Sequence, residues 1–451
     1  MRIKKVNVSK LFGIFNHEIA MKMDEHITII HAPNGFGKTA ILRMIDGLFN
    51  SHYTDLRAFP FSSFAVELDN GKVLSVQKHK NTKTQGKHKS ATNDSEKIII
   101  SCNGSNSFEL GSSLDPSKLR FPLEIIERII PELDRIGPEH WRSSEGEILS
   151  LIEVLDRYHS MLPFTDISES NLPPWFLEIK QSIDVRFIRS ERLVSHPLPQ
   201  KVSRRESRSI LTPTVMSYSN ELASEIKTTL TKYAELSQSL DRTFPVRLVN
   251  ESPTSGLTQQ EITNRLSEFE MRRKHLIESG ILDQGTDPQF QVLPTFDDTK
   301  ASVLSVYICD IQDKLAVFDV LAEKIDLFQK IINSRFKHKN MSISRDNGLT
   351  FTTDLGQPLS AANLSSGEQH EVVMLYELIF KVQKDSLILI DEPEISLHVA
   401  WQEEFLRDLQ GMTQLSKFDV LIATHSPQII SDRWDLSVEL KDAADIKKDA
   451  S

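Results

Sequence analysis

Short runs of apolar or alternating positions predict strands in the first part of the chain. Residues 2–8 alternate basic and apolar side chains, and residues 26–31 form a β-branched run. Two more runs flank the turn at residues 69–71 (Asp-Asn-Gly), which is typical of a hairpin, and residues 96–101 are a further candidate strand. Residues 1–195 therefore predict a lobe with an antiparallel β part.

Helical spacing of apolar residues first occurs after the second of these strands. It covers residues 39–49, where the apolar positions are Ile41, Leu42, Ile45, Leu48 and Phe49. Helical patterning returns at residues 121–160, interrupted by Pro131 and Pro138. The apolar run VRFI at residues 185–188 then predicts a buried strand.

The middle of the chain, residues 196–335, changes to long helices. One segment carries a heptad seam of apolar residues spaced alternately four and three apart, namely Leu304, Ile308, Ile311, Leu315, Phe318, Ala322 and Ile325. A helical hairpin that packs within the chain explains this seam, because short heptad runs are common in ordinary bundles. A coiled coil that joins two copies of the chain is the alternative.

Strands and helices alternate again in residues 336–451. Two short apolar runs, SLILI and VLIAT, lie between amphipathic helices. Such strands are typical of a largely parallel sheet, because helices cover both of its faces. We therefore expect an α/β fold in which residues 1–195 and 336–451 form two lobes of one core, and residues 196–335 are a helical insertion.

Composition narrows the class of protein without deciding its function. Of the 451 residues, 39% are hydrophobic and 26% are charged, and the net charge is −10. These values exclude a wholly disordered chain. No apolar run approaches the length of a transmembrane helix, about 18 residues. Two isolated cysteines, Cys102 and Cys309, exclude a disulfide framework and fit a reducing compartment, so we expect a cytoplasmic protein without membrane contact.

The turn between residues 26–31 and the following helix carries the clearest chemistry. Its sequence, Ala32-Pro33-Asn34-Gly35-Phe36-Gly37-Lys38-Thr39, matches a P-loop except that alanine replaces the first glycine. Glycines let backbone N–H groups close around phosphate oxygens at the positive end of the helix. We expect nucleotide binding by Asn34 to Ala40, with Lys38 on the β- and γ-phosphates and the Thr39 hydroxyl on Mg²⁺.

The apolar strand that ends near residue 390 is followed by two carboxylates, Asp391 and Glu392. Adjacent carboxylates at a strand end are most often a solvated turn. In a P-loop protein, however, this is the Walker B position. We expect Asp391 to hold Mg²⁺ through water and Glu392 to orient and deprotonate the attacking water as general base.

Ser365, Ser366, Gly367 and Glu368 stand directly before a predicted helix. One interpretation is a helix cap, since Ser-Ser-Gly-Glu is good capping chemistry. The other is a second anion site, made of a hydroxyl, backbone N–H groups and a helix N-terminus. The place of this turn shortly before Asp391 favours the second interpretation.

These elements, with His425 after the run VLIAT, follow one another in the order Walker A, signature, Walker B and switch histidine. The order resembles ABC-class ATPases of the SMC, RecF and OLD group. The resemblance implies an ABC-type P-loop core with a mixed, largely parallel sheet, an antiparallel β-subdomain and a helical hairpin or coiled-coil insertion. It also implies that His425 contacts the γ-phosphate and that Ser396, Leu397 and His398 form a D-loop.

In that class the signature turn closes on the nucleotide held by the P-loop of a partner subunit. The resemblance therefore implies ATP and Mg²⁺ as cofactors, ATP hydrolysis, and a head-to-tail dimer or higher homo-oligomer. Three positions depart from the usual pattern. Ser366 stands where glycine is usual, Glu368 where glutamine is, and His398 where aspartate is frequent.

Residues 363–380, 386–402 and 420–430 resemble the PtuA family, the ATPase subunits of Septu-type antiphage systems, which also occur beside retrons. That resemblance implies a small HNH nuclease partner, PtuB, whose activity the ATPase controls. It also implies that nucleic acid is reached through the complex, together with a reverse transcriptase and its RNA/DNA product in a retron setting. Because the chain ends soon after His425, we expect no Toprim nuclease domain in it.

Two other functions fit the same motifs: a RecF- or SMC-like repair ATPase that acts directly on DNA, and a nucleotide-binding scaffold without turnover. Several weaker candidates stay open. Phe12 or Phe15 could stack on adenine or be core aromatics, and Arg189 and Arg192 could contact phosphate or form structural ion pairs. The Lys-rich residues 78–97 predict a solvated loop more readily than a contact with a nucleic-acid backbone.

Overall fold

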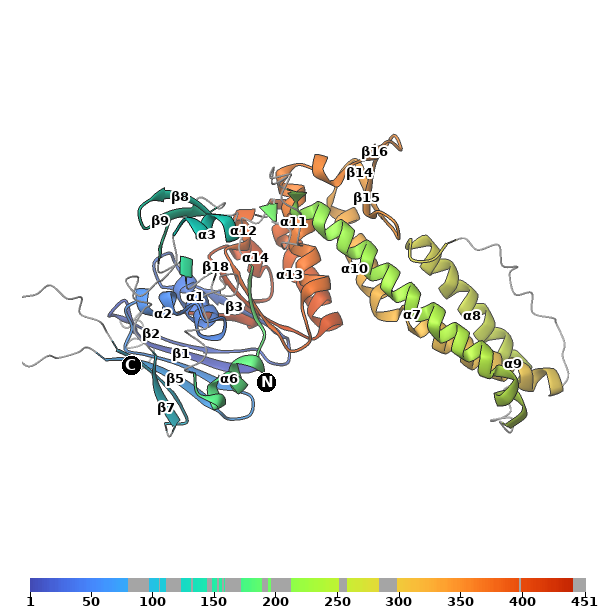
Figure 1. Cartoon of the computed structure of the whole chain (residues 1–451), viewed down its shortest axis with the longest axis horizontal. Helices are drawn as coiled ribbons and strands as arrows, with labels where there is room; N and C mark the ends of the chain where they lie inside the picture. The colour runs from blue at the N-terminus through green and yellow to red at the C-terminus, as the bar shows by residue number, and fades with distance from the viewer. Residues whose placement is uncertain are drawn as a thin grey trace, which may run out of the picture. The chain divides into compact units, whose positions relative to one another are not determined.

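The structure is a computed structural model that describes residues 1–79, 97–104, 106–110, 123–130, 133–143, 148–151, 154–155, 158, 172–188, 194–195, 212–250, 258–283, 298–396 and 399–440 (Figure 1). The chain divides into two compact units. The first, which we call the core unit, combines Met1–Leu198 with Lys381–Ser451. The second, which we call the helical unit, is Pro199–Phe380.

A parallel sheet lies at the centre of the core unit. Its strand order is β11 (Val185–Ile188), β17 (Leu387–Asp391), β18 (Asp419–Thr424), β3 (Ile27–His31) and β19 (Ser437–Glu439). Side chains on both faces are buried, as the uninterrupted apolar runs predict: Leu389 and Leu421 join one hydrophobic cluster, and Ile388 and Ile422 on the opposite face are also buried. The predicted parallel sheet is confirmed.

Helix α1 (Lys38–Phe49) packs against β11, β17 and β18. The core unit also contains the helices α2 (Tyr53–Ala58), α12 (Pro393–Ser396), α13 (Val399–Ser416) and α14 (Pro427–Ile430) and the 3₁₀ turn η4 (Trp434–Leu436). The helix is buried on nearly all sides, and of its 12 residues only Thr39 and Arg43 are not buried. This packing places the start of α1, at Lys38, directly after β3 and the phosphate loop.

An antiparallel sheet forms the other half of the core unit. Its order is β2 (Phe15–Ala20), β1 (Ile3–Leu11), β4 (Ser63–Leu68), β5 (Val73–His79), β6 (Lys97–Cys102) and β7 (Asn106–Leu110). Helix α6 (Pro174–Gln181) packs on it through Trp175 and Phe176, whose rings contact Phe108. A single hydrophobic cluster joins this sheet, α1 and one face of the parallel sheet, so the core unit has the predicted mixed α/β core with an antiparallel β part.

Residues 121–160 differ from the helical prediction. Helix α3 (Glu124–Ile129) ends before Pro131, and beyond it come β8 (Leu133–Gly137), β9 (His140–Ser143) and β10 (Ile148–Ser150). Leu151, Val154 and Leu155 are helical again, as predicted. These strands pair around a small separate core that contains the fully buried Trp141. The helical prediction was wrong there because pairing and burial of Trp141 outweigh a weak local periodicity.

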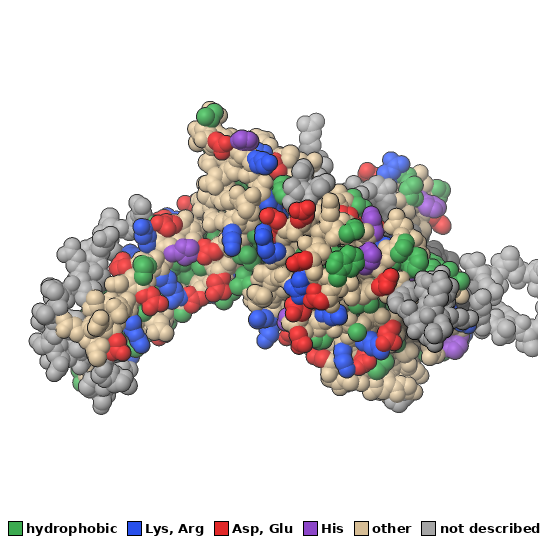
Figure 2. All heavy atoms as spheres, turned by 180° about the vertical axis from the view of Figure 1, so that it is seen from behind, with side chains coloured by type: hydrophobic (Ala, Val, Ile, Leu, Met, Phe, Trp, Pro, Cys, Tyr) green, Lys and Arg blue, Asp and Glu red, His purple; other side chains and the backbone are tan. Residues whose placement is uncertain are grey.

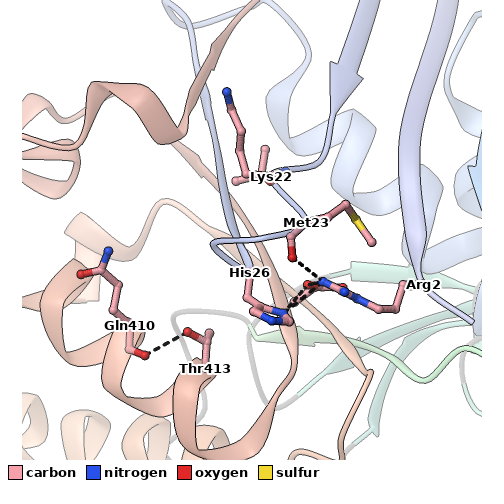
Figure 3. Close-up of polar contacts among 8 residues, drawn as sticks. Arg2, Lys22, Met23, His26, Gln410 and Thr413 are labelled. Carbon is pink, nitrogen blue, oxygen red and sulfur yellow. Dashed lines mark hydrogen bonds and ion pairs between the residues drawn. The ribbon is translucent and has the colours of Figure 1, made fainter. Parts of the chain in front are cut away.

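Arg2 ties the first strand to the parallel sheet. Its guanidinium donates to both carboxylate oxygens of Asp419, at 2.7 and 2.5 Å, and to the Met23 carbonyl at 2.9 Å (Figure 3). His26 lies 2.9 Å from the same carboxylate. The bidentate bond raises the pKa of Arg2 above its usual value, although burial opposes the increase. This partly buried pair ties the start of β1 to the start of β18.

The helical unit consists of long helices and a small antiparallel sheet. The helices are α7 (Thr214–Asn250), α8 (Gln259–Glu278), α9 (Asp298–Ala316) and α10 (Asp319–Arg335). Helix α9 packs against α7 and α8, and Ile308, Leu315, Phe318 and Ile325 are buried within the unit. The seam residues therefore pack within the chain, which confirms the helical hairpin interpretation.

The sheet of the helical unit follows α10 and leads to the signature turn. It contains β14 (Lys339–Ser344), β15 (Gly348–Thr353) and β16 (Pro358–Leu359), and β15 packs against α7 (Figure 1). The 3₁₀ turn η2 (Ala361–Asn363), helix α11 (Ser366–Tyr376) and a π-helical turn, η3 (Glu377–Lys381), follow in sequence. The remaining short strands are β12 (Val194–Ser195) and β13 (Thr212–Pro213).

Surface charge in the helical unit is mixed. On the face shown in Figure 2, acidic and basic side chains are interspersed along the helices. Among the described residues, no helix has both the length and the apolar character needed to cross a membrane.

Candidate phosphate-binding site

A cavity of about 520 Å³ opens beside the phosphate loop in the core unit. Its walls are formed by Asn34, Gly35, Gly37, Lys38, Thr39, Ala40 and Glu392, together with Phe12, Arg43 and Phe59. Most of the residues predicted to bind nucleotide therefore line one space. The ring of Phe36 packs instead against Phe15, with 5.1 Å between ring centroids. Of Phe36, only the backbone is therefore a candidate for binding phosphate.

The two loop glycines have the backbone conformation that a phosphate-binding turn needs. Gly35 and Gly37 have φ of 89° and 87°, in the left-handed region. Gly37 is also the N-cap of α1 and provides no side-chain cap, so no capping side chain takes up the first backbone N–H groups of the helix. Ala32, which replaces the first glycine of the motif, does not have a positive φ and is buried without strain.

Lys38 is almost fully buried and is held by the loop itself. Its ammonium donates to the Ala32 carbonyl at 2.8 Å and to the Pro33 carbonyl at 3.2 Å. Burial lowers the pKa of Lys38, and the charges of Glu392, Asp391 and Glu394 oppose that decrease. The lysine is thus poised next to the turn in which phosphate oxygens would lie.

The residues expected to hold Mg²⁺ meet in the core unit. The Thr39 hydroxyl, at the start of α1, lies near the Asp391 carboxylate at the end of β17. Burial raises the pKa of Asp391, while the nearby Thr39 hydroxyl and the charge of Lys38 lower it. Mg²⁺ in phosphate sites keeps several waters and takes few protein oxygens, so a hydroxyl and a carboxylate beside an open phosphate cradle fit this ion.

Glu392 and His425 lie close together at the ends of neighbouring strands. Glu392 has a strained left-handed backbone, with φ of 45°, and its N–H donates to the Ala423 carbonyl at 2.8 Å. Nδ1 of His425 is 3.8 Å from Glu392 and 3.1 Å from Glu394. The parallel pairing of Asp391 with Ala423 brings these side chains to one edge of the sheet.

The predicted signature turn lies in the helical unit. Ser365 caps α11 in a capping box: its hydroxyl accepts from the Glu368 N–H, and its own N–H donates to the Glu368 carboxylate at 2.8 Å. The Ser365 hydroxyl also donates to that carboxylate at 2.8 Å. Lys339 donates to the same carboxylate at 2.6 and 2.7 Å. Burial acts to raise the pKa of Glu368, but Lys339 and Ser365 outweigh it and lower that pKa. Ser366 and Gly367 form the first turn of α11.

The other predicted positions divide into described and undescribed residues. Ser396 ends α12, whereas Leu397 and His398 of the expected D-loop lie outside the described residues. Arg189, Arg192 and most of residues 78–97 also lie outside them, except that the Lys78 ammonium donates to the carbonyls of Arg57 and Phe59. Phe15 is a core residue, which confirms that interpretation for it.

Sequence reasoning missed two residues of the cavity wall, Arg43 and Phe59. The Arg43 guanidinium lies over the Phe59 ring, 5.6 Å from its centroid, and the Phe12 ring meets Phe59 edge to face. Phe12, one of the open candidates, is 42% exposed here. Arg43 had a usable signal, since it is one helical turn beyond Thr39 and must share its face. Phe59 had none.

Comparisons with known proteins were made against families, curated sequences and solved structures. A family model described as the AAA ATPase domain matches residues 1–430. Over 69 residues the chain is 35% identical to protein ea59 of Escherichia phage lambda, which covers 15% of this chain and 13% of that protein. The chain therefore aligns with only a small part of this relative.

Solved structures of SMC head domains are similar to this chain, with low TM-scores and low sequence identity. The Smc head of Pyrococcus furiosus with an extended coiled coil, bound to the C-terminal domain of ScpA, is 13% identical, with 100% of this chain and 99% of that chain covered and a TM-score of 0.32. The SMC head of Thermotoga maritima is 12% identical, with 95% and 91% covered and a TM-score of 0.30. The family match takes in nearly the whole chain, and with the phosphate loop and Walker B strand in place, the chain belongs to the AAA ATPase domain family.

Proposed function

We propose that this protein binds and hydrolyses ATP as the regulatory subunit of an antiphage defence complex. The observation that carries the nucleotide part is the meeting of Lys38, Thr39 and Glu392 around one cavity, with Asp391 close enough to Thr39 to be affected by its hydroxyl. These residues come from segments more than 350 positions apart in the chain. Nothing in the packing of a simple structural turn requires a lysine, a hydroxyl and two carboxylates at one point.

Each side chain has a defined task in this proposal. Lys38 exchanges the carbonyls of Ala32 and Pro33 for the β- and γ-phosphate oxygens, and the backbone of Gly35 and Gly37 surrounds them. Thr39 and Asp391 would hold Mg²⁺, which supplies charge neutralisation at the phosphates when bound. Glu392 takes a proton from the attacking water, and His425 contacts the γ-phosphate.

The site is completed in trans by the signature turn of a second subunit. Ser365, Ser366 and Gly367 supply a hydroxyl and the N-terminal backbone of α11, and Glu368 is part of the same turn. In the proposed homo-oligomer, each nucleotide lies between the phosphate loop of one protomer and the signature turn of the next. The support for this arrangement is the resemblance to ABC-class ATPases, and in the single chain Ser365 serves as the cap of α11.

The defence role rests on the resemblance of three segments to the PtuA family. In that role the oligomer holds and controls a small HNH nuclease, and nucleic acid is cleaved by the nuclease. A retron-associated form would add a reverse transcriptase and its RNA/DNA product. The similarity to protein ea59 of phage lambda covers only a small part of either protein, so it does not enter this proposal.

Two substitutions test nucleotide binding and hydrolysis. Lys38→Ala removes a charged donor to phosphate and is expected to weaken ATP binding by about 100-fold. Glu392→Gln removes the general base and is expected to lower kcat by about 100- to 1000-fold while ATP stays bound. Lys22→Ala, at an exposed lysine of the same unit, is the matched control. Unchanged ATP affinity in Lys38→Ala would overturn the assignment of the phosphate loop.

Copurification and plaque assays test the defence role. Co-expression with the neighbouring genes should yield a stable complex with an HNH nuclease, and protection against phage should be lost in Lys38→Ala. Tight duplex binding by the chain alone, with a steep salt dependence, would instead support a DNA-repair ATPase. No phosphate release in the presence of partner and DNA would support a nucleotide-binding scaffold.

A further inference from the structure

We propose that Glu394 is a positioning residue for His425, an inference that rests on the proposed ATPase function. Glu394 follows the Walker B pair on α12, and its side chain is only 9% exposed. Oε1 of Glu394 accepts from the Thr424 hydroxyl at 2.7 Å and from the His425 backbone N–H at 3.1 Å. Nδ1 of the His425 ring is also 3.1 Å from Oε1.

The distances single out Glu394 over Glu392 as the partner of the ring. Nδ1 of His425 lies 3.8 Å from Glu392, beyond hydrogen-bonding range, but within that range of Glu394. When Nδ1–H is directed at Glu394, the tautomer and the ring orientation are set, and Nε2 is the nitrogen left to face a ligand. Glu394 also accepts from the backbone N–H of His425, so it contacts both the backbone and the ring of that residue.

The burial of this carboxylate argues for a role beyond packing. Oε2 of Glu394 is buried and has no hydrogen-bond partner among the described residues. A buried carboxylate with one unsatisfied oxygen is costly, and a glutamine could serve Thr424 and the backbone N–H equally well. The negative charge has a use if the ring of His425 must be held and charge-balanced while it contacts phosphate.

Helix α12 and the adjacent strand bring the pair together. Gln402 on α13 donates to the Glu394 carbonyl at 3.1 Å, and Thr424 is fully buried beside it. The Ser426 N–H donates to Thr424 Oγ1 at 3.0 Å, which continues the bonded chain past His425. Both sides of the Glu394–His425 contact are therefore anchored to rigid parts of the core unit.

A double-substitution cycle tests the proposal. Glu394→Gln keeps the acceptor for Thr424 and for the His425 N–H, so the fold should be retained, and thermal unfolding checks this. We expect kcat to fall by about 10- to 100-fold, with the Kd for ATP changed less than about threefold. Adding Glu394→Gln to His425→Ala should cause no further loss. Glu403→Gln, at an exposed glutamate on α13, is the control and should behave as wild type. Full activity of Glu394→Gln, or losses that multiply in the double variant, would overturn the proposal.

Chemical labelling of the ring gives a readout that does not require turnover. The rate at which diethyl pyrocarbonate acylates His425, followed by mass spectrometry of its peptide, should rise at least about threefold in Glu394→Gln, because the ring loses its anionic acceptor. The same rate should be unchanged in Glu403→Gln. If the wild type releases no phosphate, the proposed function fails while this labelling still decides the contact. An unchanged labelling rate in Glu394→Gln would refute it.

Discussion

Gly35 and Gly37 have nearly the same backbone conformation but different surroundings. A Cβ on Gly35 would meet nothing within 4 Å, whereas a Cβ on Gly37 would lie 2.5 Å from Cδ2 of the buried Leu11. Both positions have positive φ, which costs a residue with a side chain about 1–2 kcal/mol. At the residue scale, the open space at Gly35 is where a ligand would approach, whereas Leu11 of β1 leaves no room for a side chain at Gly37.

These surroundings predict different effects of alanine at the two glycines. Gly37→Ala should lower the free energy of unfolding by at least about 2 kcal/mol, because the Leu11 clash adds to the backbone cost. Gly35→Ala should cost only the backbone part but should weaken ATP binding, because the new methyl group fills the phosphate space. Urea unfolding and ATP titration measure the two quantities. Equal losses of stability would contradict the geometry.

His17 predicts a pH dependence of stability. Its ring is buried between Phe15 and the loop, and Nε2 lies 3.0 Å from the Phe36 carbonyl. Burial lowers the pKa of His17 in the native state, against the opposing effect of the Phe36 bond. Below the unfolded pKa of about 6.5, the unfolded chain takes up a proton that the native chain resists, so stability falls as the pH falls.

His17→Gln should remove this part of the pH dependence while a donor to Phe36 is retained. The wild type should lose more stability than the variant between pH 7.5 and pH 5.5, by up to about 1 kcal/mol. Urea unfolding at the two pH values measures the difference. Parallel losses in both proteins would show that His17 titrates normally.

At the scale of elements, a buried ion pair joins α10 to the signature helix α11. Arg335 and Glu371 contact each other, and their side chains are 0% and 2% exposed. Removing one partner of a buried pair leaves an uncompensated charge, which costs about 3–5 kcal/mol. The ion pair thus holds α11, the helix that Ser365 caps, against the C-terminal end of α10.

Substitution of the pair predicts a strong coupling. Arg335→Met and Glu371→Leu should each destabilise the protein by about 3–5 kcal/mol, and the double variant should recover most of that loss. Arg265→Met, at an exposed position on α8, should change stability by less than about 0.5 kcal/mol. Urea unfolding of the full chain measures each value. Additive losses in the double variant would mean that the two side chains do not depend on each other.

Elements with strong local patterns were predictable, and elements held by tertiary contacts were not. The parallel strands β17 and β18 are uninterrupted apolar runs, and α1 has an apolar face directly after a strand and a glycine turn. Residues 133–143 and 148–150 form short strands around Trp141 although their spacing resembles a helix. The helix predicted through residues 368–382 also contains the π-helical turn η3, where the Tyr218 hydroxyl donates to Glu377 at 2.6 Å.

At the scale of the whole molecule, the proposed site requires two protomers. Lys38→Ala should disable the phosphate loop of a protomer, and Ser365→Arg should disable its signature turn. A mixture of the two variants forms some interfaces that pair an intact loop with an intact turn. Mixed oligomers should therefore regain part of the ATPase activity, up to about one quarter of the wild-type sites if assembly is random and each site is independent.

The measurement is phosphate release by mixed and unmixed variants at equal total protein. Native mass spectrometry must first establish that mixed oligomers form. If proven mixed oligomers are as inactive as either parent, the nucleotide sites are not composite in the way proposed.

The sequence by itself determined the parallel strands, and it predicted a phosphate-binding loop and Walker B carboxylates at their ends. Those features are contiguous, and their spacing follows directly from strand and helix periodicity and from the need for glycine in a tight turn. Only the tertiary structure decided which distant residues surround them. Phe59 reaches the cavity because α2 returns the chain to α1, and Glu394 meets His425 because β17 and β18 are parallel neighbours whose carboxyl ends lie together. Contacts of this kind depend on how strands pair, and strand pairing joins segments that no local pattern links.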